Sequence, residues 1–397
     1  MGIISPWNYP LQLAISPLTS ALAAGNRCMI KMATHSQGLC LLLHRLTSQV
    51  LPEELVAFLP GVPASEFTSL PFDHLIFTGS PRSGRTVMKT AADNLTPVTL
   101  ELGGKSPTIV ASDFDIDKAV NRILYVKYMN AGQTCVAPDY LFLPENRVEA
   151  FVDKAQKLIH TRYPRLDTVD YTSIIDTRAY ARLMDCLQDA RAKGANVINL
   201  LPGVESDEGL RKISPTLVLN VTDDMILMQE EIFGPLLPIK TYQNLDQAIA
   251  YINGRQRPLA LYLFTSDRAI QEKVISNTIS GGVCINDCAM HVAQHDLPFG
   301  GIGNSGMGQY HGYEGFAEFS KLRPVFQQAP MPASRSSILC LRPACTRMLS
   351  VLTSIPAVTR VEQAAASIPA PTISTRQVWH TPVAEAPLRW QSAGILT

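Results

Sequence analysis

This sequence has no excess of positive or negative charge, because its 34 Lys and Arg residues are balanced by 34 Asp and Glu residues. It contains no basic stripe or polybasic run, so electrostatics give no reason to expect nucleic acid or an anionic membrane as a partner. Ser, Asn, Arg and Lys interrupt every apolar run before the ~18 residues of a membrane span. The remaining composition, 46% hydrophobic over 397 residues, is typical of a globular protein with material for two domain cores.

Metal-binding spacings are also missing from the eight cysteines. These are Cys28, Cys40, Cys135, Cys186, Cys284, Cys288, Cys340 and Cys345. A chain of this length does not need disulfides and shows no charged-then-apolar stretch of the secretory kind, so we expect a reducing, cytoplasmic location. His291 and His295 have the i,i+4 spacing of zinc ligands on a helix, but no further ligand cluster accompanies them. We therefore expect no bound metal.

The first part of the chain alternates short apolar strands with helices, and we assign residues 1–104 to one domain. Strands are expected at 2–5, 28–31, 55–59, 74–78 and 99–102, and helices at 11–24, 38–51 and 84–93. This alternation predicts an α/β fold in which helices cover both faces of a parallel sheet.

A second α/β domain is expected over residues 105–303, followed by a closing segment, 304–328. Its strands are expected at 107–110, 140–143, 216–219, 236–241, 260–264 and 282–286, and its helices at 115–130, 145–158 and 180–193. Residues 329–397 are rich in Pro, Ser, Thr, Ala and Arg and keep no regular apolar period, which predicts a poorly ordered tail. An amphipathic helix over 345–352 is the alternative.

Cys135 is the candidate nucleophile, and Glu101 is the carboxylate that accompanies it. Cys135 ends the run Asn-Ala-Gly-Gln-Thr-Cys, whose small residues leave a sulfur accessible. A thiol that attacks a carbonyl needs a base for its proton and for the later water, so the pair indicates covalent acyl chemistry. Taken alone, Cys135 is better explained as a buried small hydrophobe, and Glu101 has the alternative of a surface carboxylate at a strand end.

Asn8 lies where the first strand ends and the next helix begins, the edge at which open α/β sheets bind ligands. Its amide can donate to a developing oxyanion, a contact typically worth ~3 kcal/mol of barrier. A helix cap explains this residue equally well. The run Phe-Thr-Gly-Ser at 77–80 likewise leaves backbone donors free for a phosphate, although alone it is a helix start and the sequence has no GxGxxG fingerprint.

Six runs of this sequence resemble the aldehyde dehydrogenase superfamily, in that family's order and close to its spacing. They are PWNYP (6–10), FTGS (77–80), LELGGKSP (100–107), NAGQTC (130–135), EEIFGP (230–235) and LPFGGIGNSGMG (297–308). Residues 281–308 look most like the coniferyl aldehyde dehydrogenase and class 3 branch. The resemblance implies a two-lobed fold, with an open parallel-sheet NAD(P)-binding domain and an α/β catalytic domain, and a homodimer.

The same resemblance implies oxidation of an aldehyde, aromatic or medium-chain aliphatic, to the carboxylic acid with NAD or NADP. Cys135 attacks the aldehyde carbon, while Asn8 and the Cys135 backbone N–H stabilise the oxyanion. Hydride transfer to the nicotinamide leaves a thioester, which water activated by Glu101 hydrolyses. Because transfer to coenzyme A does not need a water-activating carboxylate, Glu101 favours hydrolysis.

The resemblance also implies which residues contact the cofactor. They are Ile4, Trp7, Lys31, Thr34, Gly79, Ser80, Leu102, Glu231 and Phe233. Glu231 and Phe233 are expected at the nicotinamide ribose and ring, and Ile4 and Trp7 at the floor of the cofactor cleft. Phe233 has the alternative of an ordinary core aromatic.

Thr34 departs from the family pattern. Gly79 and Ser80 are expected at the pyrophosphate and Lys31 at the adenosine ribose. Many NAD-preferring members carry a glutamate three residues after this lysine, where it accepts hydrogen bonds from the ribose and repels a 2′-phosphate. With Thr34 in its place, we expect NADP to be tolerated or preferred.

Both ends of the chain also depart from the family. Members normally carry a long segment before the PWN run, including part of a hairpin used in oligomerisation, so a homodimer is doubtful here. Three hypotheses therefore stand: a working aldehyde dehydrogenase, a truncated remnant without turnover, and a cofactor-independent esterase that uses Cys135, Asn8 and Glu101. The segment around His291 and His295 is expected to be a loop at the substrate entrance.

Overall fold

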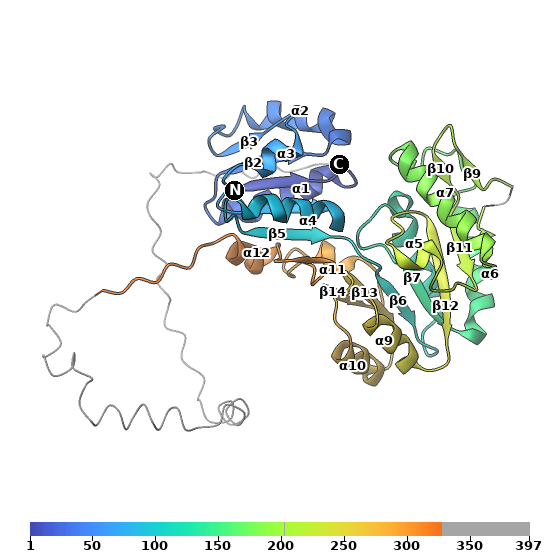
Figure 1. The fold of residues 1–397 in the computed structure, drawn as a ribbon. Helices are drawn as coiled ribbons and strands as arrows, with labels where there is room; N and C mark the ends of the chain where they lie inside the picture. Colours follow the sequence, from blue (N-terminus) through green and yellow to red (C-terminus); the bar gives the residue numbers. More distant parts are fainter. Residues whose placement is uncertain (202, 328–397) are drawn as a thin grey trace, which may run out of the picture. The chain divides into compact units, whose positions relative to one another are not determined.

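Two open, mostly parallel sheets organise the protein in the computed structural model, which describes residues 1–201 and 203–327 (Figure 1). Met1–Leu322 form one compact unit, and Arg323–Thr397 belong to a second. The tail expected over 329–397 and the alternative helix over 345–352 lie outside the described residues. No helix within the described ranges has the length and apolar character that crossing a bilayer requires.

The first sheet has six strands in the order β15-β5-β4-β1-β2-β3. Its elements are β1 (Gly2–Ser5), α1 (Pro10–Ala23), β2 (Cys28–Met32), η1 (Thr34–Ser36), α2 (Gln37–Thr47), β3 (Val56–Phe58), α3 (Ala64–Thr68), β4 (Leu75–Gly79), α4 (Pro81–Ala92), β5 (Val98–Leu102), β15 (Gly306–Met307) and α12 (Gly312–Glu318). The strands β1 to β5 pair in parallel, and their side chains are buried on both faces, as in sheets that helices cover twice.

The second sheet has seven strands in the order β14-β13-β6-β7-β12-β11-β8, parallel except for β8. Its strands are β6 (Pro107–Val110), β7 (Tyr140–Pro144), β8 (Asn196–Asn199), β11 (Thr216–Leu219), β12 (Leu236–Tyr242), β13 (Ala260–Phe264) and β14 (Gly282–Ile285). The helical and remaining elements are α5 (Ile116–Tyr128), η2 (Met129–Gly132), η3 (Glu145–Arg147), α6 (Val148–Arg162), α7 (Thr177–Ala192), β9 (Ser206–Asp207), β10 (Lys212–Ile213), α8 (Ile226–Gln229), α9 (Leu245–Asn253), α10 (Arg268–Asn277) and α11 (Met290–Ala293).

The closing segment returns to the first sheet, where Figure 1 shows it in orange beside the cyan strand β5. β15 pairs antiparallel with β5, and the backbone N–H of Leu102 donates to the carbonyl of Ser305 over 3.0 Å. Gly306 makes this pairing possible, because its φ is +143° and a Cβ there would lie 2.0 Å from the carbonyl oxygen of Leu100. The segment therefore closes over the strand that carries Glu101.

The predicted α/β class is confirmed, and the strands expected at 107–110, 216–219 and 260–264 have the observed bounds. The pattern did not reveal α9 and α10, which are short surface helices between buried strands. It also missed the short edge strands β8 and β15, which pair antiparallel with their neighbours. Such edge pairing depends on tertiary contacts rather than on local sequence. The expected helix over 145–158 begins as η3 and continues as α6 to Arg162.

Gly306→Ala should lower the free energy of unfolding by about 2–3 kcal/mol, because a Cβ there collides with β5 and the backbone has a left-handed φ. Gly38→Ala is the matched control, since it lies at the start of α2 with open space around it. That change should leave stability equal or raise it by about 0.5–1 kcal/mol. Denaturant melts measure both, and equal effects of the two changes contradict the closing role of β15.

Candidate active site

A tightly bent loop carries Cys135 out of α5. Asn130, Ala131 and Gly132 have φ values of +52°, +51° and +75°, so three successive residues are left-handed. A Cβ on Gly132 would lie 2.2 Å from the carbonyl oxygen of Gly234, which leaves glycine as the residue that fits. The nucleophile loop, residues 130–135, thus packs directly against the segment that contains Glu231 and Phe233.

Gln133 holds this loop in shape, a role that the sequence interpretation missed. Its Nε2 donates to the carbonyl oxygens of Asn130 and Ser173, each over 3.1 Å, and its Oε1 accepts from the N–H of Ile175 over 2.9 Å. The side chain is buried, so each of these bonds replaces one that water would otherwise supply. The available signal was its position in the NAGQTC motif, two residues before Cys135.

Asn8 reaches the nucleophile loop from the end of β1. Its Nδ2 donates to the carbonyl oxygen of Gln133 over 3.2 Å, and the next residue, Tyr9, shares a 2.8 Å hydrogen bond with Thr134 Oγ1. The helix-cap alternative is wrong, since Tyr9 is the N-cap of α1 and no side-chain cap bond forms there. An amide nitrogen carries two hydrogens, so Asn8 keeps a second donor for an oxyanion.

Cys135 lies partly exposed beside two carboxylates and is not one of the fully buried cysteines. Burial of the thiol, followed by the charges of Glu231 and Glu101, raises its pKa to about 12, whereas the backbone N–H groups of Cys135 and Val136 lower it. The thiol is therefore protonated at neutral pH in this arrangement. Nucleophilic attack requires a base nearby.

Glu101 is buried at the end of β5, with 2% of its surface exposed, so the surface-carboxylate alternative is wrong. Neither carboxylate oxygen has a hydrogen-bond partner among the described residues. Burial, together with the charge of Glu318, raises the pKa of Glu101 well above its ordinary value. A carboxyl group tuned in this direction can accept a proton at neutral pH and release it afterwards.

Glu231 and Phe233 lie against the glycines that follow Glu101. A Cβ on Gly103 would lie 2.2 Å from Oε2 of Glu231, so the carboxylate occupies the space that a side chain at Gly103 would fill. Burial and the charge of Asp139 raise the pKa of Glu231 to about 8. Phe233 is half-buried with a φ of +47°, and its ring meets Trp7 edge-on at 5.7 Å, so it is not an ordinary core aromatic.

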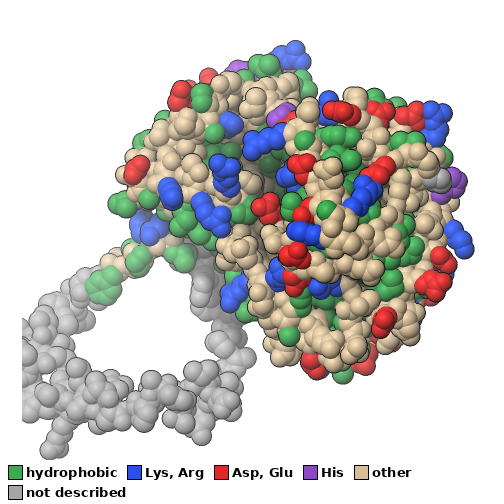
Figure 2. Space-filling view, turned by 45° about the vertical axis from the view of Figure 1, so that its right-hand side comes forward, with side chains coloured by type: hydrophobic (Ala, Val, Ile, Leu, Met, Phe, Trp, Pro, Cys, Tyr) green, Lys and Arg blue, Asp and Glu red, His purple; other side chains and the backbone are tan. Residues whose placement is uncertain are grey.

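A cleft of about 680 Å³, here called the basic cleft, adjoins these groups. Its lining includes Ser80, Gly103, Gly104 and Glu231. The basic side chains along it are Arg82, Arg85, Lys105, Arg255 and Arg257. Figure 2 shows Lys and Arg side chains bordering a hollow on the face that it presents. Size, glycine walls and positive charge fit a dinucleotide with a diphosphate.

The other residues expected at the cofactor lie at the carboxyl ends of neighbouring parallel strands. Ile4 and Leu102 belong to one buried apolar cluster at the ends of β1 and β5. Gly79 ends β4, and a Cβ there would lie 2.5 Å from the Phe77 ring. Lys31, buried at the end of β2, has its pKa lowered by that burial, and Thr34 begins η1 in an exposed position. Neither Lys31 nor Thr34 lines the basic cleft.

Lys105 and Asp139 form an ion pair that sequence reasoning did not identify. Lys105 Nζ donates to the Asp139 carboxylate and to the carbonyl oxygens of Leu227 and Glu230, over 2.7 and 3.0 Å. Asp139 Oδ1 in turn accepts from the N–H of Ile232 over 2.9 Å. The pair fixes the segment on either side of Glu231. Lys105 belongs to the LELGGKSP motif, so its position was visible although its partner was not.

The two candidate metal histidines occupy different surroundings. His291 is buried in α11, where its ring lies beside those of Tyr262 and Phe299, so the expected loop is in part a helix. His295 is exposed beyond α11. In the described part of the chain, no three His, Cys, Asp or Glu side chains gather as metal ligands.

Comparisons with known proteins agree with this geometry. A profile of the aldehyde dehydrogenase family matches residues 1–325. The probable coniferyl aldehyde dehydrogenase of Pseudomonas aeruginosa is 52% identical over 338 residues, 84% of this chain and 70% of that protein. The dimeric NADP-preferring aldehyde dehydrogenase of Canis lupus familiaris is 41% identical over 325 residues, 81% of this chain and 70% of its own length. The substrate-bound structure of Staphylococcus aureus AldH has a TM-score of 0.76 at 38% identity, covering 89% of this chain and 76% of that one.

The fold and the site define an oxidoreductase that uses a nicotinamide cofactor. The chain belongs to the aldehyde dehydrogenase family, whose members oxidise aldehydes to acids, and its likeness to the coniferyl and class 3 branch is confirmed.

Asn8→Ala should lower kcat by about 10²–10³-fold if the amide donates to the oxyanion as expected, because the change removes that donor and also frees the carbonyl of Gln133. Asn121→Ala, an exposed change on α5, is the control and should leave kcat unchanged. Steady-state rates of both variants test this. A normal kcat for Asn8→Ala excludes the role.

Glu101→Gln should make stability less dependent on pH. The unfolded glutamate ionises near pH ~4.3, whereas the folded pKa is raised, so the wild type loses stability relative to the variant as pH rises through this window. Melts from about pH 5 to about pH 9 should show a growing advantage for Glu101→Gln. Glu149→Gln, exposed on α6, is the control. A constant difference across this range rules out the raised pKa.

Proposed function

We propose that this chain oxidises an aromatic aldehyde of the coniferyl type to its acid through Cys135, Asn8 and Glu101. The observation that supports this most is the bond from Asn8 to Gln133, because it joins the oxyanion donor of the first sheet to the nucleophile loop of the second. The name of the relative from Pseudomonas aeruginosa favours the aromatic over the medium-chain aliphatic substrate.

The first half of the reaction forms a thioester. The thiol of Cys135 loses its proton to the neighbouring carboxylate of Glu231, and the sulfur adds to the aldehyde carbon. The second amide hydrogen of Asn8 and the backbone N–H of Cys135 stabilise the resulting oxyanion. Loss of a hydride from the same carbon restores the carbonyl and leaves the acyl group on sulfur.

The second half releases the acid. The carboxylate of Glu101 takes a proton from water, the hydroxide adds to the thioester carbon, and the C–S bond breaks. The departing sulfur regains the proton held by Glu231 and becomes the thiol of Cys135 again, and Glu101 releases its proton to solvent. The raised pKa of Glu101 suits this task, because a carboxylate of higher pKa is the stronger base. Coenzyme A is not required as acceptor.

The cofactor, when bound, supplies a nicotinamide ring that accepts the hydride. The diphosphate would be held by Gly79, Ser80 and the arginines of the basic cleft. The nicotinamide ribose and ring would be contacted by Glu231 and Phe233. Thr34 carries no charge to repel a 2′-phosphate, which supports NADP as a tolerated or preferred cofactor. The dog relative is named as dimeric, which supports a dimer here as well.

The decisive experiment mixes purified protein with coniferaldehyde and NADP or NAD and follows reduced cofactor in single and multiple turnovers. The wild type should form reduced cofactor over many turnovers, and Cys135→Ala should form no reduced cofactor. Glu101→Gln should keep the first burst and slow later turnovers about 10²–10⁴-fold. Cys284→Ala is the control, because its thiol is absent from the proposed steps.

The same assay separates the alternatives. Cleavage of an activated ester without reduced cofactor identifies the esterase, and folded protein without either activity identifies the inactive remnant. A Glu101→Gln variant that turns over at the wild-type rate contradicts the proposed deacylation step.

Thr34→Glu should shift the ratio of kcat/KM values toward NAD by about tenfold or more, because a carboxylate beside the adenosine ribose repels a 2′-phosphate by at least ~1 kcal/mol. Thr161→Glu, an exposed position on α6, controls for the added charge. Initial rates at varied NAD and NADP give both ratios. A strong preference of the wild type for NAD rules out the role of Thr34.

A further inference from the structure

A second cleft, of about 900 Å³, follows one face of α1 and is here called the α1 cleft. Its lining residues are Asn8, Tyr9, Pro10, Leu11, Gln12, Ile15, Ser16, Thr19, Ser20, His295, His311 and Gly312. The helical members recur three or four positions apart, as residues on one helix face do. The volume lies within the range of small-molecule sites.

The α1 cleft is continuous with the nucleophile loop. Asn8 and Tyr9 line the cleft, and the same two side chains bond to Gln133 and Thr134, immediately before Cys135. A ligand in the cleft therefore lies one side chain away from the sulfur-bearing loop. Its reactive group is expected at the Asn8 end.

The lining of the α1 cleft carries no fixed charge, because none of its described lining residues is Lys, Arg, Asp or Glu. A charged group on a ligand would lose its hydration without gaining a counter-ion, which is costly. The cleft thus favours a neutral ligand. Its polar groups beyond Asn8 and Tyr9 include the imidazoles of His295 and His311.

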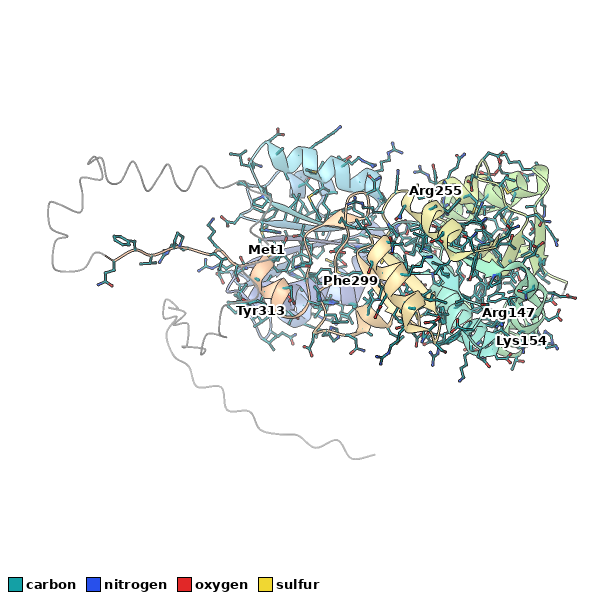
Figure 3. The ribbon with its side chains drawn as sticks, turned by 90° about the horizontal axis from the view of Figure 1, so that it is seen from below. Met1, Arg147, Lys154, Arg255, Phe299 and Tyr313 are labelled. Carbon is teal, nitrogen blue, oxygen red and sulfur yellow. The ribbon has the colours of Figure 1, made fainter. Side chains whose placement is uncertain are left out.

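His311 is held rigidly with hydrogen-bonding capacity to spare. Its surface is 4% exposed, and Nδ1 has no partner among the described residues. The ring stacks on Phe299 at 5.8 Å and meets Tyr310 edge-on at 4.6 Å, while the ring of the exposed His295 lies 5.3 Å away. Figure 3 labels Phe299, the ring on which His311 rests.

The His311 imidazole stays neutral at physiological pH. Burial, followed by the nearby His295, lowers the pKa of His311 to about 4. A neutral imidazole offers one donor and one acceptor, which matches a hydroxyl group. It offers no positive charge for a carboxylate.

We propose that His295 and His311 bind the phenolic hydroxyl of the substrate and so determine the preference for a free hydroxyl over its ether. This inference rests on the proposed function and assigns two specificity-determining residues to the same site. The apolar wall of Leu11 and Ile15 accommodates a planar ring, and the imidazoles satisfy its hydroxyl. An aliphatic aldehyde leaves the buried imidazole of His311 unpaired, which lowers its specificity constant.

The test compares coniferaldehyde with its 4-O-methyl ether, which cannot donate a hydrogen bond from that oxygen. The wild type should show a kcat/KM about tenfold higher for the phenol, the value of one hydrogen bond. His295→Phe and His311→Phe should bring the ratio close to one, with the rate on the ether largely retained. His160→Phe, an exposed histidine on α6, should keep the wild-type ratio.

Equal rates on the two aldehydes in the wild type, or an unchanged ratio in both variants, overturn the inference while leaving the proposed function intact. If the wild type oxidises neither aldehyde, the proposed function fails, and binding decides the inference separately. Calorimetric titration with coniferyl alcohol and its 4-O-methyl ether should then show tighter binding of the phenol in the wild type alone. Equal binding of the two alcohols to the wild type overturns the inference. Because His295 is exposed, His295→Phe carries the test if His311→Phe fails to fold.

Discussion

The hydrogen bond from Asn8 to the carbonyl of Gln133 is the constraint on which the site depends. It joins the segment after the carboxyl end of β1, an interior strand of the first sheet, to the loop before Cys135, across a sequence separation of 125 residues. The left-handed run from Asn130 to Gly132 bends the loop so that this carbonyl faces Asn8, and the buried side chain of Gln133 prevents the loop from relaxing. Asn8, after a strand of the first sheet, and Cys135, before a strand of the second, are thus held in one geometry.

Burial tunes the electrostatics of this site. Glu101, Glu231 and Cys135 are each shifted toward their uncharged forms, because the protein replaces water around them with few dipoles. A carboxylate with a raised pKa is a stronger base, so the ionised forms of Glu101 and Glu231 are suited to take up a proton beside Cys135. The nearby Lys105 and Asp139 form an ion pair instead, and the bonds of this pair hold the Glu231 segment in place.

Much of this could be predicted from the sequence, for identifiable reasons. The strand at 260–264 is a continuous apolar run, and the strand at 107–110 is apolar except for Thr108, a composition that is typical of fully buried parallel strands. Asn8 was a candidate because ligands bind where such strands end, but its bond to Gln133 was not visible, since no local pattern encodes a partner so distant in sequence. The same holds for Lys105 with Asp139 and for β15, which returns to cover the strand of Glu101. Contacts between residues distant in sequence were missed, whereas most strands marked by apolar runs were found.

The central claim is that the acyl group is carried by the sulfur of Cys135. Its most direct test is mass spectrometry of peptides from Glu101→Gln, quenched during turnover with coniferaldehyde and NADP. The account predicts an added acyl mass on the peptide that contains Cys135. Reduced cofactor formed without that adduct, or an adduct on Cys284 instead, contradicts it.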